Sequence, residues 1–170
     1  RTSTSLSGRK SSLKAVPLSS VTSDGTRAFL GTDKGLVIAV ALNSGKIEWT
    51  FQAGDRVHST PAVSDGKVFF GSYDRHLYAL EASTGKLLWK VASGGNEMSS
   101  PVVSGGVVYM GSGFPNQKVL AVTTAGKLLW QYDLGQMSYS SPALSGNTLL
   151  VAANNGFLTG LDVANGRFMV

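Results

Sequence analysis

The sequence predicts an all-β protein, a β-propeller of four-stranded antiparallel blades. A block of about forty residues occurs four times in the sequence. Each block contains a Gly followed by a basic residue and an apolar run. The marker glycines lie 40, 41 and 40 residues apart, at Gly45, Gly85, Gly126 and Gly166. A fixed period of this size is typical of propellers and solenoids. Apolar residues are nowhere sustained at helical spacing, so we expect few helices.

Four short apolar runs within a block predict four strands, taken here in chain order. The first run follows a Ser-Thr-Pro or Ser-Ser-Pro triplet, at 59–61, 99–101 and 140–142. The second run ends in a small residue, at 28–31, 68–71, 107–111 and 149–152. Turn formers follow and favour a tight hairpin: Lys34-Gly35, Asp74-Arg75 and Asn155-Gly156. A third run, 77–80 in the second block, precedes the marker turn and the fourth run.

These blocks predict one domain of four blades, at about 18–56, 57–96, 97–137 and 138–170. The four blades make half of an eight-bladed ring or a small closed ring. Residues 1–17 are rich in Ser and Thr and contain basic residues but no acidic ones. We expect them to be a linker or the remnant of a preceding segment. Because the sequence begins with Arg1, we expect a piece of a longer protein.

The stretch Ala79-Leu-Glu-Ala-Ser-Thr-Gly-Lys-Leu-Leu-Trp89 resembles the tryptophan-docking repeat of the pyrroloquinoline-quinone (PQQ)-like propellers. Residues 39–49 and 121–130 are looser copies, and 160–170 is a degenerate copy. The resemblance covers about residues 20–170. Non-catalytic members, such as BamB-type outer-membrane assembly scaffolds and sensor propellers, are more similar than the enzymes. The resemblance therefore implies a protein- or ligand-binding scaffold or sensor module in a periplasmic or extracellular protein.

The resemblance also implies that the Trp closing each blade packs against the neighbouring blade. Trp suits this role because its large apolar ring carries an N–H that can reach a backbone carbonyl, and Gly tolerates the positive φ of a tight turn. The residues concerned are Trp49, Trp89 and Trp130, with Gly45, Gly85 and Gly126 in the turns before them. Val170 holds the fourth Trp position.

A fragment of a quinoprotein alcohol or sugar dehydrogenase is the alternative function. The resemblance implies that such enzymes hold PQQ on the propeller axis with calcium and an Asp base, and typically a vicinal Cys pair. This chain has no Cys, and its ten acidic residues are scattered, mostly in turns. We therefore expect no catalytic residue, no metal site and no cofactor, with PQQ and calcium only under the alternative. His58, the one candidate histidine, cannot form a metal site by itself.

Loops that join successive blades, and loops between the middle strands, are expected to gather on one face of a propeller. They differ between blocks while the strand positions repeat, so we expect them to carry the binding residues. Exposed aromatic and charged side chains there suit a protein or peptide segment as partner. The candidates are Arg56, His58, Asn96, Glu97, Met98, Phe114, Asn116 and Tyr139.

Charge and hydropathy exclude two partner classes. The net charge is +5, but beyond residue 20 the chain holds eleven basic and ten acidic side chains, so the blades are nearly neutral. We therefore expect no nucleic-acid partner. No apolar run approaches the length of a membrane-spanning helix.

Four blades of a type that usually closes with seven or eight leave two apolar end faces. Three arrangements cover them: the rest of a longer chain, a homodimer that completes the ring, or a closed four-bladed ring. We expect a fragment of a larger propeller, with a self-completing dimer as the state of the isolated piece.

Overall fold

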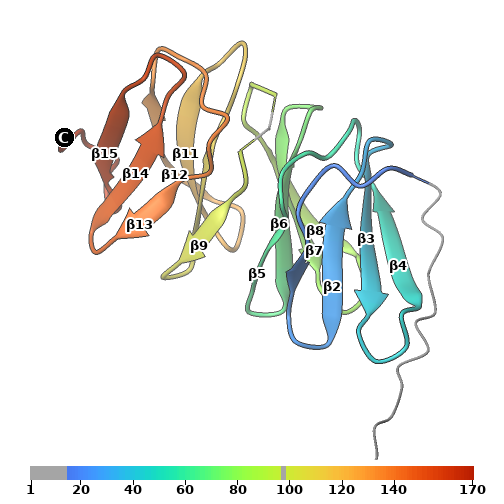
Figure 1. Cartoon of the computed structure of the whole chain (residues 1–170). Helices are drawn as coiled ribbons and strands as arrows, with labels where there is room; N and C mark the ends of the chain where they lie inside the picture. The colour runs from blue at the N-terminus through green and yellow to red at the C-terminus, as the bar shows by residue number, and fades with distance from the viewer. Residues whose placement is uncertain (1–14, 97–98) are drawn as a thin grey trace, which may run out of the picture.

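The computed structural model describes residues 15–96 and 99–170, and it is all-β as predicted. Four antiparallel sheets follow one another along the chain in a partial ring (Figure 1). Blade 1 holds β1 (Thr22–Ser23), β2 (Arg27–Gly31), β3 (Leu36–Ala41) and β4 (Ile47–Gln52). Blade 2 holds β5 (Ala62–Ser64), β6 (Lys67–Ser72), β7 (His76–Glu81) and β8 (Leu87–Ala92).

The C-terminal half continues the pattern. Blade 3 holds β9 (Val102–Ser104), β10 (Val107–Gly111), β11 (Lys118–Thr123) and β12 (Leu128–Asp133). Blade 4 holds β13 (Ala143–Ser145), β14 (Thr148–Ala152) and β15 (Leu158–Asp162). Strands pair with their chain neighbours in every sheet, so each blade is a meander.

Blade 4 differs from the prediction because its fourth run forms no regular strand. Phe168 makes an isolated bridge with Leu161, and Gly160 exchanges hydrogen bonds with Met169 and Val170. The last run therefore lies against β15 without the ladder seen in blades 1 to 3.

Alternation along the strands gives each blade two apolar faces, and facing surfaces of successive blades pack together. Phe29, Val37 and Trp49 of blade 1 pack with Val68 and Phe70 of blade 2. The junctions between blades 2 and 3 and between blades 3 and 4 repeat this arrangement. The hydrophobic core therefore consists of three separate layers, one between each pair of neighbouring blades, rather than one central cluster.

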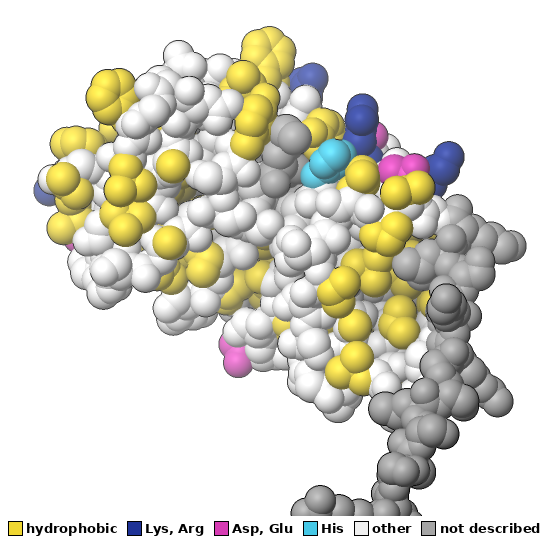
Figure 2. All heavy atoms as spheres, in the orientation of Figure 1, with side chains coloured by type: hydrophobic (Ala, Val, Ile, Leu, Met, Phe, Trp, Pro, Cys, Tyr) yellow, Lys and Arg dark blue, Asp and Glu magenta, His cyan; other side chains and the backbone are white. Residues whose placement is uncertain are grey.

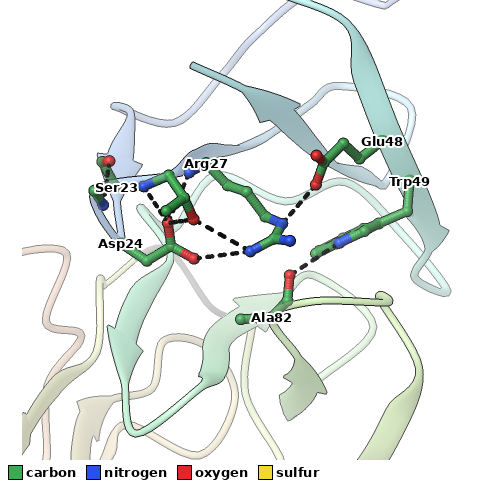
Figure 3. A network of polar contacts seen from close by, with 8 residues as sticks. Ser23, Asp24, Arg27, Glu48, Trp49 and Ala82 are labelled. Carbon is green, nitrogen blue, oxygen red and sulfur yellow. Dashed lines mark hydrogen bonds and ion pairs between the residues drawn. The ribbon is translucent and has the colours of Figure 1, made fainter. Parts of the chain in front are cut away.

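A tryptophan latch closes each of these junctions. The indole N–H of Trp49 donates to Ala82 O at 3.0 Å, as Figure 3 shows. Trp89 donates to Thr124 O at 3.1 Å, and Trp130 donates to Val163 O at 3.0 Å. We use "latch" for this Trp and the carbonyl and marker Gly that it meets on the next blade.

The marker Gly is required by the latch for two reasons. Gly85 has a φ of 73°, in the left-handed region that glycine adopts readily. A Cβ on Gly85 would lie 2.6 Å from the Trp49 ring, closer than carbon atoms approach. Gly126 and Gly166 stand in the same relation to Trp89 and Trp130. Gly45 has a comparable φ of 66° in the blade 1 turn.

An ion-pair network lies beside the first latch (Figure 3). Arg27 Nε donates to Glu48 Oε2 at 2.5 Å, and Arg27 Nη1 lies 3.5 Å from Asp24 Oδ2. The hydrogen bond to Glu48 raises the pKa of Arg27. Burial raises the pKa of Asp24, but hydrogen bonds from Arg27 and Thr26 outweigh it, so the net shift is downward. The network ties the β1–β2 turn to β4.

Replacing one glycine by alanine in two different turns isolates the latch contact. Gly66 has a φ of 70° and open space where a Cβ would stand, whereas Gly85 meets Trp49. We expect Gly66→Ala to lower the free energy of unfolding by about 1 kcal/mol through backbone strain alone. Gly85→Ala adds a clash, so we expect a loss of about 2–4 kcal/mol. Urea unfolding measures both, and equal losses contradict the latch contact.

Candidate functional site

The loops gather on one face, which we call the loop face. It is formed by the inter-blade loops 53–59 and 134–140, by the described residues 93–96 and 99 of the loop between them, and by the turns 32–35, 73–75, 112–117 and 153–157. Backbone bonds tie the first inter-blade loop to both neighbours. Val57 N–H donates to Thr32 O of blade 1, and Tyr73 N–H of blade 2 donates to Arg56 O, both at 3.0 Å.

Asp74 anchors this loop from blade 2. Its Oδ2 accepts the Gly54 N–H at 3.1 Å and the hydroxyl of Tyr78. Burial, then the hydrogen bond and charge of Asp74, raise the pKa of Tyr78 to about 12. Asp74 Oδ1 is buried without a hydrogen bond, and His76 Nδ1 lies 3.5 Å from it. His76 Nδ1 also lies 2.9 Å from the backbone oxygen of Asp74.

Arg56, His58 and Tyr73 form an aromatic and cationic cluster on the loop face. The Arg56 guanidinium carbon lies 4.9 Å from the Tyr73 ring centroid, and the His58 and Tyr73 centroids are also 4.9 Å apart. A cation above an aromatic ring is attracted to its electron-rich face. Figure 2 shows a histidine beside basic side chains along the upper edge of the molecule.

The charge of this cluster comes from Arg56 alone at neutral pH. Burial, with the nearby Arg56 charge, lowers the pKa of His58. The imidazole is therefore neutral, and its Nε2 is buried without a hydrogen-bond partner. Burial raises the pKa of Tyr73, and Tyr139 and Asp55 raise it further while Arg56 opposes them. The Arg56 side chain is 52% exposed, and its Nε lies 3.9 Å from Asp55 Oδ1, which is equally exposed.

A second group of predicted residues surrounds Gly113 between blades 2 and 4. Asn96 N–H donates to Phe114 O at 3.0 Å, and Gly113 N–H donates to Asn96 O at 2.9 Å. These bonds hold the 113–117 insertion while the Phe114 side chain stays 62% exposed. The Tyr139 hydroxyl donates to Met137 Sδ at 3.1 Å. Asn116 Nδ2 lies at 3.4 Å from Ser93 O.

The predicted residues thus fall into two groups on one face. Arg56 and His58 lie at the blade 1–2 junction, and Asn96, Phe114, Asn116 and Tyr139 lie around the insertion. Glu97 and Met98 lie outside the described residues. Tyr73, which was not among the predicted residues, contacts both Arg56 and His58.

Neither a metal-binding cluster nor a membrane-spanning helix occurs in the described part of the chain. Within residues 15–96 and 99–170, no three His, Cys, Asp or Glu side chains group to hold a metal ion. The same residues include no helix long and apolar enough to cross a membrane. The loop face offers an exposed cation, exposed aromatic rings and amide side chains. Backbone hydrogen bonds hold the loops that carry them.

A model of the family described as outer membrane protein assembly factor BamB matches residues 4–167. The chain belongs to this family of PQQ-like repeat propellers. A search of the curated proteins finds no match.

Three solved structures have the same fold. BamB from Moraxella catarrhalis is 23% identical with a TM-score of 0.80, over 92% of this chain and 50% of that chain. Quinohemoprotein alcohol dehydrogenase from Comamonas testosteroni is 18% identical with a TM-score of 0.79, over 92% and 34%. The computationally designed Ika4 protein is 13% identical with a TM-score of 0.78, over 92% and 99%. The chain therefore spans about half the length of the BamB structure.

Alkaline titration tests the Tyr78–Asp74 anchor. The folded chain holds the Tyr78 phenol protonated to about pH 12, above its ordinary pKa of 10.0. A pKa raised on folding contributes stability that is complete below pH 10 and is lost as pH rises to about 12. We expect the free energy of unfolding to fall over this window, and to fall less in Tyr78→Phe. Identical pH profiles for the two proteins contradict the anchor.

Proposed function

We propose that the chain is a non-catalytic scaffold module whose loop face binds a protein or peptide segment. The carrying observation is that backbone hydrogen bonds hold the loops between blades while Arg56 and Phe114 remain exposed. A partner then meets side chains that need no reordering of the backbone, which lowers the entropic cost of binding.

The two groups on the loop face suit different parts of one extended segment. The Arg56–Tyr73 pair offers a planar guanidinium for a carboxylate or a carbonyl. Phe114 and Tyr139, 62% and 44% exposed, offer apolar area for a side chain of the partner. Membership of the BamB family supports an extracytoplasmic, periplasmic location for this binding.

A fragment of a quinoprotein dehydrogenase is the second candidate, supported by the fold it shares with the Comamonas testosteroni enzyme. The residues of this chain do not fit the group that such an enzyme holds. No cluster of three carboxylates or imidazoles stands within the described residues to hold calcium. We therefore derive no step through PQQ.

Peptide selection tests the scaffold proposal. A random-peptide phage library is selected on the whole chain, and binding of the enriched peptides is measured by calorimetry. We expect Phe114→Ala or Arg56→Ala to weaken binding about tenfold or more, because each removes an anchor side chain. Leu88→Ala is the matched control, because Leu88 is also exposed but lies on outer strand β8. Peptides that bind both loop variants as tightly as the wild type contradict the proposal.

Quinone retention separates the two functions. The chain is incubated with PQQ and calcium chloride, gel-filtered, and assayed for bound quinone by absorbance. We expect none to travel with the protein, because the described residues assemble no ligand group for calcium. Stoichiometric retention would instead favour the dehydrogenase alternative.

A further inference from the structure

The outward face of blade 4 carries exposed apolar side chains. Leu149 and Val151 of β14 face blade 3, so the alternating residues of β14 and β15 face outward. Leu158 is 63% exposed and Val170 is 69% exposed. Apolar side chains also gather at the blade 4 end in Figure 2. The equivalent face of blades 1 to 3 packs against the next blade.

A ladder of hydroxyl contacts along the innermost edge shows how one blade joins the next. Ser20 N–H donates to Thr60 Oγ1 at 3.2 Å, and Thr60 N–H donates to Ser100 Oγ at 2.9 Å. Ser100 N–H donates to Ser141 Oγ at 3.1 Å. The ladder ends in an exposed donor, the Ser141 N–H, and an exposed acceptor, the Ser20 hydroxyl.

The latch pattern also indicates that the outward face of blade 4 would fit a surface like that of blade 1. The carbonyls that accept the Trp N–H belong to Ala82, Thr124 and Val163, and Leu42 holds this position in blade 1. Leu42 is 54% exposed. Val170 stands where a Trp would donate. It supplies apolar contact but no N–H from its side chain.

We propose that a second copy of this chain docks the outward edge of its blade 1 on the outward face of blade 4. A twofold axis makes the same contact twice and closes one ring. Ser141 N–H of each copy then donates to Ser20 Oγ of the other, and Val170 and Leu158 pack near Leu42 and Val21. Two chains match the length of the BamB structure, of which one chain spans 50%.

The docking contact is narrower than the internal junctions. On blade 1, Val21 and Leu42 are 61% and 54% exposed, but Leu30 and Ile38 are only 6% and 2% exposed. The partner's blade 4 therefore meets the rim of this face rather than its centre. The narrow contact and the missing Trp make the dimer weak. We therefore expect the dimer fraction to change with protein concentration.

Light scattering after gel filtration, over a concentration series of the full chain, tests the proposal. We expect a mass that rises from 17.8 kDa toward twice that value. Val170→Trp restores the latch donor, so we expect the dimer dissociation constant to fall about tenfold. Met169→Trp is the matched control, because it adds the same ring one residue away, on the other side of the chain.

A substitution on the docking face is expected to raise the dimer dissociation constant instead of lowering it. Leu158→Arg places a charge on the proposed contact, so we expect a monomer at every concentration, with the melting temperature checking that the fold is kept. A wild-type chain that stays monomeric overturns the proposal, as does an assembly larger than a dimer. It is also overturned if Leu158→Arg leaves the dimer intact, or if the two Trp variants associate equally.

Discussion

The tryptophan latch is the constraint on which the other features of the structure depend. A single four-stranded blade has two apolar faces that it cannot bury by itself. The latch fixes how far each blade turns from its neighbour, because the indole must meet both a carbonyl and a glycine on the next blade. A fixed blade angle in turn fixes the spacing of the inter-blade loops. The loop face is therefore a product of packing at the opposite end of the blades.

This separation leaves the loop residues free to differ. The marker turns carry the latch carbonyls, while the inter-blade loops lie at the other end of each sheet. Their backbone is held by bonds such as Val57 N–H to Thr32 O, which need no particular side chain. The side chains of Arg56 and Phe114 consequently contribute little to the fold, and a scaffold can change its partner there at small cost in stability.

The forty-residue period and the Gly-basic-Trp pattern were sufficient to predict the fold, because both are set by strand and turn chemistry that repeats. The fourth run was predicted as a strand, but Gly160 and Val170 pair irregularly. Arg56 and His58 were predicted on the loop face, but their contacts with Tyr73 were not, because these depend on which loop side chains turn toward one another. Asp74 likewise looked like a turn former only, and its bond to Gly54 across the blade junction needed the structure.

The two links between blades differ in how strictly they constrain the sequence. The inner ladder needs only a hydroxyl, and Ser or Thr fills every rung from Ser20 to Ser141. The latch needs one large side chain with an N–H, and at Val170 that requirement is not met. An end blade that keeps the tolerant link and lacks the strict one has a surface that fits another blade but binds it weakly. In the proposed dimer, Val170 and the narrow contact at blade 1 together limit how tightly the ring closes, independently of the loop face.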